Sequence, residues 1–266
     1  MSEFFLELFS EEIPAGLQKN LREKIFEDFK NLFEEKSIRS KKNFSFSTPN
    51  RLVLVFEGLD KQIKIKSKEI RGPKTSAPEQ ALEGFLRSNK INKKDLFKKK
   101  TEKDEFYFYK TVATSLKTHD LLTEFIPKIL SNYQWKKSMK WGEFDLNWGR
   151  PLKSILSIFD KKIVSFKFHH LTSSNLTFLD KDFEEKKRSF ENFKKYEKFF
   201  EDNGVIVNQN KRLKIINKSF LKILGKKGLK INENPKLIDE VVNLVDSPNV
   251  LSVSYTHLTL PTTRLV

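Results

Sequence analysis

The sequence predicts an α+β fold, in which mixed antiparallel sheets pack against helices and the C-terminal part is rich in helix. Two observations lead to this prediction. Short apolar or alternating runs typical of strands recur through residues 1–170 with helical patterns between them, and charged segments with apolar residues at helical spacing follow. We therefore expect an α+β body at residues 1–175, a helix-rich region at 176–251 and a terminal segment of different composition at 252–266.

The chain is expected to open with a strand and a long helix. Phe4–Phe9 is a short apolar run of the kind that forms a buried strand. Ser10 offers a side-chain cap ahead of Pro14, a residue that the first turn of a helix tolerates. Apolar residues then recur at helical spacing over residues 17–35, which predicts a helix with one face toward the core.

Strands and a helix alternate over the next segment. Arg51–Leu59 and Gln62–Ile70 are expected as two strands, and the second alternates isoleucine with lysine as a half-buried sheet edge does. Ala77–Arg87 resumes helical spacing, and the lysine-dense residues 88–104 are expected to form a solvated helix and turn. Glu105–Ala113 alternates aromatic residues, which predicts a strand with both faces partly covered.

A helix and a hairpin are expected in the middle of the chain. Asp120–Ser131 has apolar residues at helical spacing, with Pro127 indicating a kink or an early stop. Leu152–Phe159 and Ile163–Phe168 are separated by a short polar connection, which predicts a hairpin.

Three helices are expected after the hairpin. Residues 181–203 combine charges with regularly spaced aromatic residues, and Gly204 follows as a helix stop. Residues 208–224 and 235–245 carry isoleucine, leucine, valine and phenylalanine at helical spacing. No internal repeat is visible in the sequence.

The formal net charge of +16 indicates a polyanionic partner, because a basic surface attracts polyanions through its field and through the release of their counterions. Nucleic acid is the obvious candidate. Lysine outnumbers arginine by 42 to 9, however, and asparagine and phenylalanine are also plentiful. All three have adenine- and thymine-rich codons, so genome composition is an alternative source of the charge.

The composition also bears on the cellular compartment. The sequence contains no cysteine, so disulfides and thiolate metal sites are excluded, and a reducing compartment is favoured. It contains no run of 18 apolar residues and no secretory N-terminal pattern, so we expect neither a membrane span nor export. We expect a cytoplasmic protein.

The segment from Lys137 to Pro151 carries the strongest binding signal. It places Lys137, Lys140 and Arg150 beside Trp141 and Trp148 within fifteen positions. Cations pair with phosphates while indole rings stack on unpaired bases, so this mixture suits contact with RNA. The alternative is a turn packed by the two tryptophans.

Two arginines flank proline-containing turns, and two glutamates lie at the start of the first expected helix. Arg51 and Arg71 are each positioned to aim a cation at a phosphate or at a partner carboxylate, with an intramolecular ion pair as the alternative. Glu11 and Glu12 precede the first helix and are expected to cap its free amides.

No catalytic or metal site is expected. His119 and Asp120 resemble a metal-binding dyad, but no histidine precedes them to complete the ligand set, and a capping role for Asp120 is favoured. The sequence has no glycine-rich phosphate loop, no dinucleotide fingerprint, and no nucleophile with a recognisable base.

Several short motifs in a fixed order carry a family resemblance. They are Ser10-Glu11-Glu12-Ile13-Pro14-Ala15, Ser47-Thr48-Pro49-Asn50-Arg51-Leu52, Arg71-Gly72-Pro73, Glu83-Gly84-Phe85-Leu86-Arg87, Lys137-Ser138-Met139-Lys140-Trp141-Gly142 and Arg150-Pro151. Together they resemble the N-terminal portion of the beta subunit of the bacterial two-subunit glycyl-tRNA synthetase. The sequence departs from the family pattern at Asn50 and Lys140, where arginine is usual, and at residues 175–178, where a Gly-His-Arg-Phe stretch is usual.

The resemblance implies a subunit that binds and positions tRNA(Gly) without catalytic residues of its own. It implies an assembly of two alpha and two beta subunits, in which the alpha subunit binds ATP with Mg and performs the glycylation. The residues expected to contact tRNA or the alpha subunit are Arg51, Arg71, Lys137, Lys140, Trp141 and Arg150. A free-standing basic RNA-binding module and a purely structural scaffold remain as alternatives.

The terminal segment 252–266 differs in kind from the rest of the chain. It has no lysine, four threonines and one arginine. It resembles the translation of a sequencing-library adapter, so we expect it to be foreign and the gene to be truncated, and we expect the fragment alone to be inactive. The alternative is an ordinary C-terminal strand and tail.

Overall fold

The computed structural model describes residues 2–65, 67, 69–89, 91–100, 104–111, 114–179, 187–227 and 234–253. In this part of the chain, six α-helices accompany several antiparallel sheets, which confirms the predicted α+β class. The chain divides into two compact units: Met1–Leu59 with Leu122–Val266, and Asp60–Leu121. The boundary expected near residue 175 falls within the first unit and stays a prediction.

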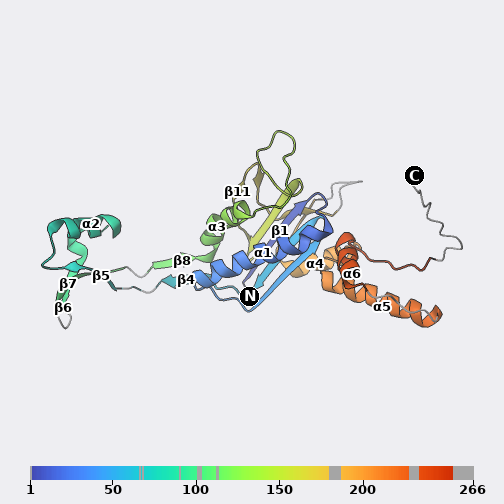
Figure 1. The fold of residues 1–266 in the computed structure, drawn as a ribbon, viewed down its shortest axis with the longest axis horizontal. Coiled ribbons are helices and arrows are strands. Elements are labelled where there is room, and N and C mark those ends of the chain that lie inside the picture. The colour runs from blue at the N-terminus through green and yellow to red at the C-terminus, as the bar shows by residue number, and fades with distance from the viewer. Residues whose placement is uncertain are drawn as a thin grey trace, which may run out of the picture. The chain divides into compact units, whose positions relative to one another are not determined.

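A five-stranded antiparallel sheet forms the centre of the first unit, with the strand order β10-β9-β1-β3-β2 (Figure 1). Its strands are β1 (Glu3–Ser10), β2 (Lys42–Thr48), β3 (Arg51–Glu57), β9 (Leu152–Phe159) and β10 (Lys162–Ile163). Strand β1 pairs with β3 on one side and with β9 on the other. Because both faces of β1 are covered, this strand is apolar almost throughout its length.

Helices cover both faces of this sheet. On one face, Phe29 and Phe33 of α1 (Ala15–Glu35) pack against Phe4 of β1 and Phe56 of β3. On the opposite face, α4 (Phe193–Asp202) packs against Phe5, the next residue of β1. Since neighbouring residues of a strand point to opposite faces, the first unit has a helix–sheet–helix core.

Two further helices pack at the β2 edge of the sheet. Helices α5 (Gln209–Lys227) and α6 (Pro235–Leu244) contact each other and β2, and α6 also contacts α1. Arg212 of α5 is fully buried there, and its guanidinium donates hydrogen bonds to backbone carbonyls in three segments. The acceptors are Val242, Ile206, Val207 and Ser47, at donor–acceptor distances of 2.9, 2.6, 3.1 and 2.8 Å.

Short strands complete the described part of the first unit. They form two hairpin pairs, β11 (Lys167–Phe168) with β12 (Leu171–Thr172) and β13 (Leu176–Phe178) with β14 (Lys187–Ser189). Helix α3 (Thr118–Asn132) begins in the last residues assigned to the second unit and continues in the first, and it contains Pro127 without ending there.

The second unit consists of two small sheets and a helix. Strand β4 (Gln62–Ile65) pairs with β8 (Thr114–Lys117), and β5 (Glu69–Lys74), β7 (Glu105–Lys110) and β6 (Leu96–Lys100) form a three-stranded antiparallel sheet in that order. Helix α2 (Glu79–Asn89) contacts β5, and a single 3₁₀ turn spans Lys93–Asp95.

Most predicted elements are present, but four expectations were wrong. Residues 62–70 form two strands with different partners, and the lysine-dense segment contains strand β6 because Phe97 pairs with Phe108. Residues 163–168 split between β10 and β11. Of the helix expected over residues 181–203, residues 181–186 lie outside the described part of the chain, residues 187–189 form strand β14, and the helix begins at Phe193. Strand β2 was not predicted.

The expected caps of the first helix are also absent. Ser10 ends strand β1, and its hydroxyl donates to the carbonyl of Glu11. Pro14 is the N-terminal flanking residue of α1, where no side chain caps the helix and no acidic residue lies in the first turn. Glu11 instead forms an ion pair with Lys153 of β9.

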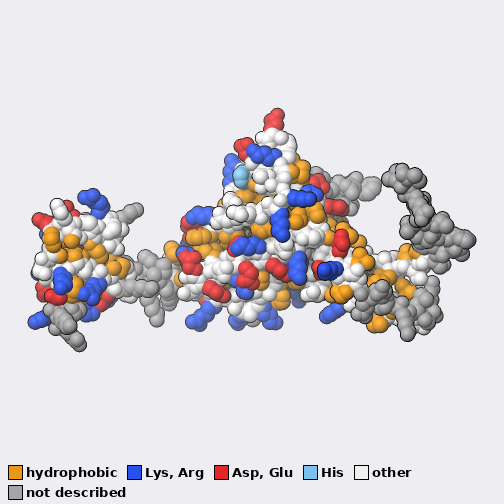
Figure 2. Space-filling model, in the orientation of Figure 1, with side chains coloured by type: hydrophobic (Ala, Val, Ile, Leu, Met, Phe, Trp, Pro, Cys, Tyr) orange, Lys and Arg blue, Asp and Glu red, His pale blue; other side chains and the backbone are white. Residues whose placement is uncertain are grey.

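Charge on the visible face is mixed. Figure 2 shows lysine and arginine side chains spread over this face with acidic side chains between them, not gathered into one large patch.

No helix among the described residues is both long and apolar enough to span a bilayer. The terminal segment expected to be foreign comprises residues 252–266. All of it from position 254 onward lies outside the described residues.

Candidate functional site

The lysine- and tryptophan-containing segment forms a closed loop on the first unit. Its ends are joined by two backbone hydrogen bonds between Met139 and Trp148, with N···O distances of 2.8 and 3.1 Å. The chain reverses near Gly142, whose φ of +54° is a conformation that glycine adopts without strain. The loop is therefore held at its base while its residues 142–145 are exposed.

The base of the loop is a packed aromatic cluster. Trp148 is only 2% exposed, and its ring centroid lies 5.0 Å from that of Trp135 and 5.8 Å from that of Phe168. A side chain at Gly149 would overlap the ring of Trp135. The packing role that we considered for both tryptophans therefore applies to Trp148, and the glycine after it is required by this packing.

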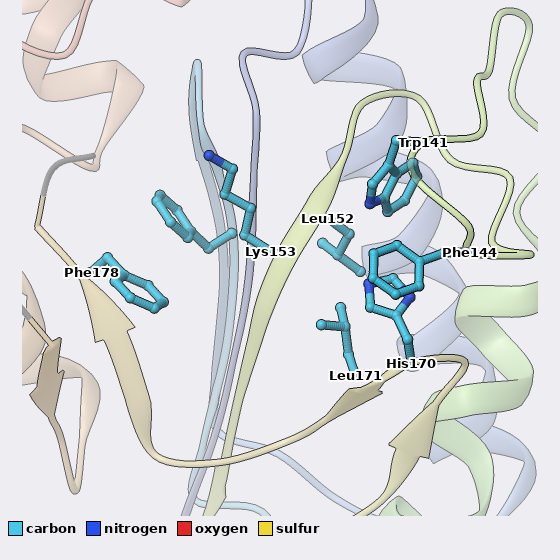
Figure 3. Close-up of a pocket in the computed structure, with 8 residues that line it drawn as sticks. Trp141, Phe144, Leu152, Lys153, His170, Leu171 and Phe178 are labelled. Atoms are coloured by element: carbon cyan, nitrogen blue, oxygen red, sulfur yellow. The ribbon is translucent and has the colours of Figure 1, made fainter. Parts of the chain in front are cut away.

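Trp141 has a different position and lines a pocket of about 390 Å³ (Figure 3). The pocket is built from the loop, the strands β1, β9, β12 and β13, and the β11–β12 turn, and most of its lining is apolar. The lining residues are Phe9, Trp141, Phe144, Leu152, Lys153, His170, Leu171 and Phe178. The loop thus contributes two of the eight side chains that surround the pocket.

The pocket has aromatic side chains on two sides. Phe144 stacks on His170 with ring centroids 3.7 Å apart and planes 8° from parallel, and Trp141 meets His170 edge-on at 5.8 Å. Phe178 stacks on Phe9 with centroids 5.6 Å apart. Figure 3 shows Trp141, Phe144 and His170 on one side, Phe178 on the other and the two leucines between them.

Two lysines bring positive charge to the pocket. Lys153 lines it and is paired with Glu11, and the ammonium of Lys187 lies 5.5 Å from the ring centroid of Phe178. Burial, and secondarily the neighbouring charge of His169, lowers the pKa of His170. The imidazole is therefore neutral near pH 7 and presents a flat, uncharged ring.

The basic residues predicted as contacts in the loop are close in sequence to residues that line the pocket. Lys137 and Lys140 are exposed, and Lys140 directly precedes Trp141. Arg150 is half-buried and donates to the carbonyl of Gly149 at 2.8 Å. Residues 136–153 hold five basic side chains and two acidic ones, Glu143 and Asp145, which gives a net charge of +3.

Arg51, which was expected to contact tRNA or the partner subunit, lies inside the first unit instead. Its side chain is 2% exposed, and its Nε lies 3.2 Å from Oε1 of Glu7, which is completely buried. Its guanidinium donates to the carbonyls of Phe178 and Leu179, and it packs over the ring of Phe9 at 4.4 Å. The intramolecular ion pair that we considered as the alternative is therefore present, and no surface remains for RNA.

Arg71 lies in the second unit. It is exposed on β5, and its guanidinium carbon lies 3.6 Å from the ring centroid of Phe106. The second unit thus has its own basic residue beside an aromatic ring.

His119 and Asp120 lie in the first turn of α3, with Nδ1 and Oδ1 3.5 Å apart. An aspartate there interacts favourably with the helix dipole. Within the described ranges, no group of three or more histidine, aspartate and glutamate side chains is arranged to hold a metal ion.

Sequence reasoning missed much of the pocket. Phe144, Lys153, His170 and Phe178 were not proposed as site residues, and only the pair of adjacent histidines offered a signal. His169 has a φ of +51°, in the two-residue turn between β11 and β12, where glycine is the usual residue. This strained turn carries His170 into the pocket wall.

Comparison with known proteins shows similarity along the chain. A family model described as glycyl-tRNA synthetase beta subunit matches residues 4–266. A glycine–tRNA ligase beta subunit of Rickettsia bellii is 38% identical over 268 residues, which cover 100% of this chain and 41% of the relative. The corresponding subunit of Rickettsia canadensis is 38% identical over 251 residues, covering 94% of this chain and 38% of the relative. The chain thus spans about two fifths of the length of these curated relatives.

Proposed function

This chain belongs to the glycyl-tRNA synthetase beta subunit family, and from that premise we propose that it binds and positions tRNA(Gly) within a glycine–tRNA ligase. The observation that supports this proposal most directly is the closed loop at residues 137–150. It presents exposed lysines next to a half-buried tryptophan and an aromatic pocket, a combination that suits phosphate and base contacts together.

In this proposal the chain positions the tRNA and contributes no catalytic residue. Contacts to phosphates fix the register of an RNA and carry little sequence information. Holding the acceptor end in place lowers the entropic cost of reaction at a site elsewhere. That site is on the alpha subunit, which binds ATP with Mg, and the assembly contains two alpha and two beta subunits in the cytoplasm.

The proposed tRNA contacts are Lys137, Lys140 and Trp141, with Arg150 at the end of the same loop and Arg71 on the second unit. Arg51 is left out because it is buried in an ion pair. Alpha-subunit contacts are proposed for the same five residues.

Charge reversal tests the proposal. The double variant Lys137→Glu/Lys140→Glu is compared with Lys214→Glu/Lys218→Glu, which makes the same charge change at two exposed positions of α5. Fluorescence anisotropy with a tRNA(Gly) transcript measures affinity at several salt concentrations. We expect the loop variant to bind at least about tenfold more weakly, with a slope of log K against log salt lower by about 2, because each phosphate contact contributes about 1. Equal effects of the two double variants would contradict the proposal.

Two alternatives make different predictions. A free-standing RNA-binding module keeps its salt-dependent tRNA affinity but does not co-purify with a co-expressed alpha subunit. A structural scaffold whose lysines reflect codon usage shows a flat plot of log K against log salt, because no counterions are released.

A further inference from the structure

We propose that the pocket beside the 137–150 loop receives a single unstacked base of the bound RNA, an inference that rests on the proposed function. The ligand class is a planar nucleobase in a single-stranded segment, with its flanking phosphates on the neighbouring lysines. The family membership and the names of the relatives assign no such site.

The size of the pocket suits one base. Its volume of about 390 Å³ lies at the lower end of the range for small-molecule pockets, roughly 300–1,000 Å³. A volume of this size accepts one planar heterocycle but not a helix or an extended peptide segment. Of its eight lining residues, five have aromatic rings when His170 is included.

The walls offer rings for stacking. Phe144 is 43% exposed although one face of its ring lies against His170, so the other parts of the ring are accessible. Phe178 is half-buried and stacks on the buried Phe9 from the opposite side of the pocket. Aromatic side chains that stack on bases raise affinity by roughly five- to a hundredfold per base.

The turn that places His170 supports a ligand-binding role. His169 holds a left-handed conformation at a position where glycine would be free of strain. Non-glycine residues in such conformations cluster at functional sites, because the surrounding structure must enforce them. Here the strained turn brings a neutral imidazole against Phe144 at 3.7 Å.

The cations near the pocket favour RNA over an apolar side chain of a protein partner. Lys153 lines the pocket, Lys187 lies against Phe178, and Lys140 precedes Trp141. Glu11 offsets the charge of Lys153. An apolar side chain would use the aromatic walls but gain nothing from these ammonium groups, whereas a nucleotide uses both.

Two RNAs separate base binding from phosphate binding. One is an unstructured dodecamer, and the other is the same dodecamer with all bases removed and all phosphates retained. The variants are Phe144→Ala and Phe178→Ala, with Phe144→Leu to keep an apolar side chain without a ring. The control is Lys137→Glu/Lys140→Glu, and thermal melting monitored by tryptophan fluorescence verifies that each variant is folded.

We expect the three ring-removing variants to weaken binding of the normal dodecamer about fivefold or more and to leave the abasic dodecamer within about twofold of the unsubstituted chain. The lysine control should weaken the binding of both RNAs alike.

If the ring-removing variants affect the binding of both RNAs equally, or of neither, the base-binding inference is overturned while the proposed tRNA function stands. Loss of alpha-subunit co-purification with RNA binding intact would assign the pocket to a protein partner and also overturn it. A failure of the proposed function appears differently, as no salt-dependent binding of tRNA at all.

Discussion

Replacing Arg51 by methionine tests whether this residue belongs to the interior of the first unit. Methionine is unbranched and uncharged and ends near the position of the arginine Nε, so the substitution removes the cation while an apolar side chain still fills part of the space. It leaves the Glu7 carboxylate, which is completely buried, without its partner at 3.2 Å. It also leaves the carbonyls of Phe178 and Leu179 without the guanidinium that bonds them.

The expected loss of stability is large. Removing one partner of a buried ion pair costs about 3–5 kcal/mol, because an uncompensated charge remains in the interior. The Phe178 and Leu179 carbonyls are only partly buried, so losing their donor adds less than the roughly 1–3 kcal/mol that a fully buried unsatisfied group costs. Thr177 still donates to Glu7 at 2.8 Å and offsets part of the loss. We therefore expect the free energy of unfolding to fall by about 4 kcal/mol, a large share of the roughly 5–15 kcal/mol typical of a domain.

Urea denaturation followed by tryptophan fluorescence is the assay, because Trp135, Trp141 and Trp148 all lie in the first unit. Arg51→Lys is the matched control, which keeps the charge but not the planar fork of donors. The double variant Arg51→Met/Glu7→Gln should recover at least half of the lost stability, since it removes the unpaired charge.

The pH dependence provides a second readout. Burial raises the pKa of Glu7, and Arg51 is the main influence that lowers it again. In the methionine variant the pKa of Glu7 rises further, so the folded state binds a proton that the unfolded state does not. The stability difference from the unsubstituted chain should therefore shrink as the pH falls from 7 to 5. A variant within about 1 kcal/mol of the unsubstituted chain at pH 7 would show that the buried ion pair is not as described.

Three further predictions concern other parts of the first unit. Gly149→Ala should lower stability by about 2 kcal/mol and shift the tryptophan emission, because the new methyl group overlaps Trp135; a silent substitution in both measurements would argue against the aromatic cluster. Arg212→Lys should lower the free energy of unfolding by about 3 kcal/mol in a denaturant titration, since one ammonium cannot reach the carbonyls that the buried guanidinium bonds. The lowered pKa of His170 means that the unfolded state binds a proton more readily, so stability should fall as the pH drops below 6.5. His170→Phe should flatten this part of the stability profile, and an unchanged slope would contradict the assignment.

Local patterns in the sequence were sufficient for several regular elements of the first unit, although not for strand β2. The apolar run at Phe4–Phe9 is a strand, and the helical spacing at residues 17–35 is a helix, because each pattern is long and has a single period. The same holds for β9 and for helices α5 and α6. The loop with Lys137, Lys140 and Trp141 could also be recognised, since its residue types are close together in the chain.

Elements that depend on a distant partner could not be recognised in this way. The lysine-dense residues 96–100 form a strand because they pair with the aromatic strand β7, and their own pattern favours a solvated segment. The charged segment after residue 180 includes strand β14, which pairs with residues 176–178. In both segments backbone pairing outweighs local propensity.

By itself, the sequence determined the fold class, the family and the loop that concentrates cations and tryptophans. Only the tertiary structure decided which side chains are buried and which ones meet. Arg51 and Lys140 each follow a turn or loop signal, yet only Arg51 is internal. The register of β1 and β3 pairs Arg51 with Phe9 and places Glu7 two residues farther along β1 on the same face, where the two form an ion pair. The pocket joins Phe9, Phe144, His170 and Phe178 from four separate segments. Burial and contact depend on residues far apart in the chain, so local spacing carries no record of them.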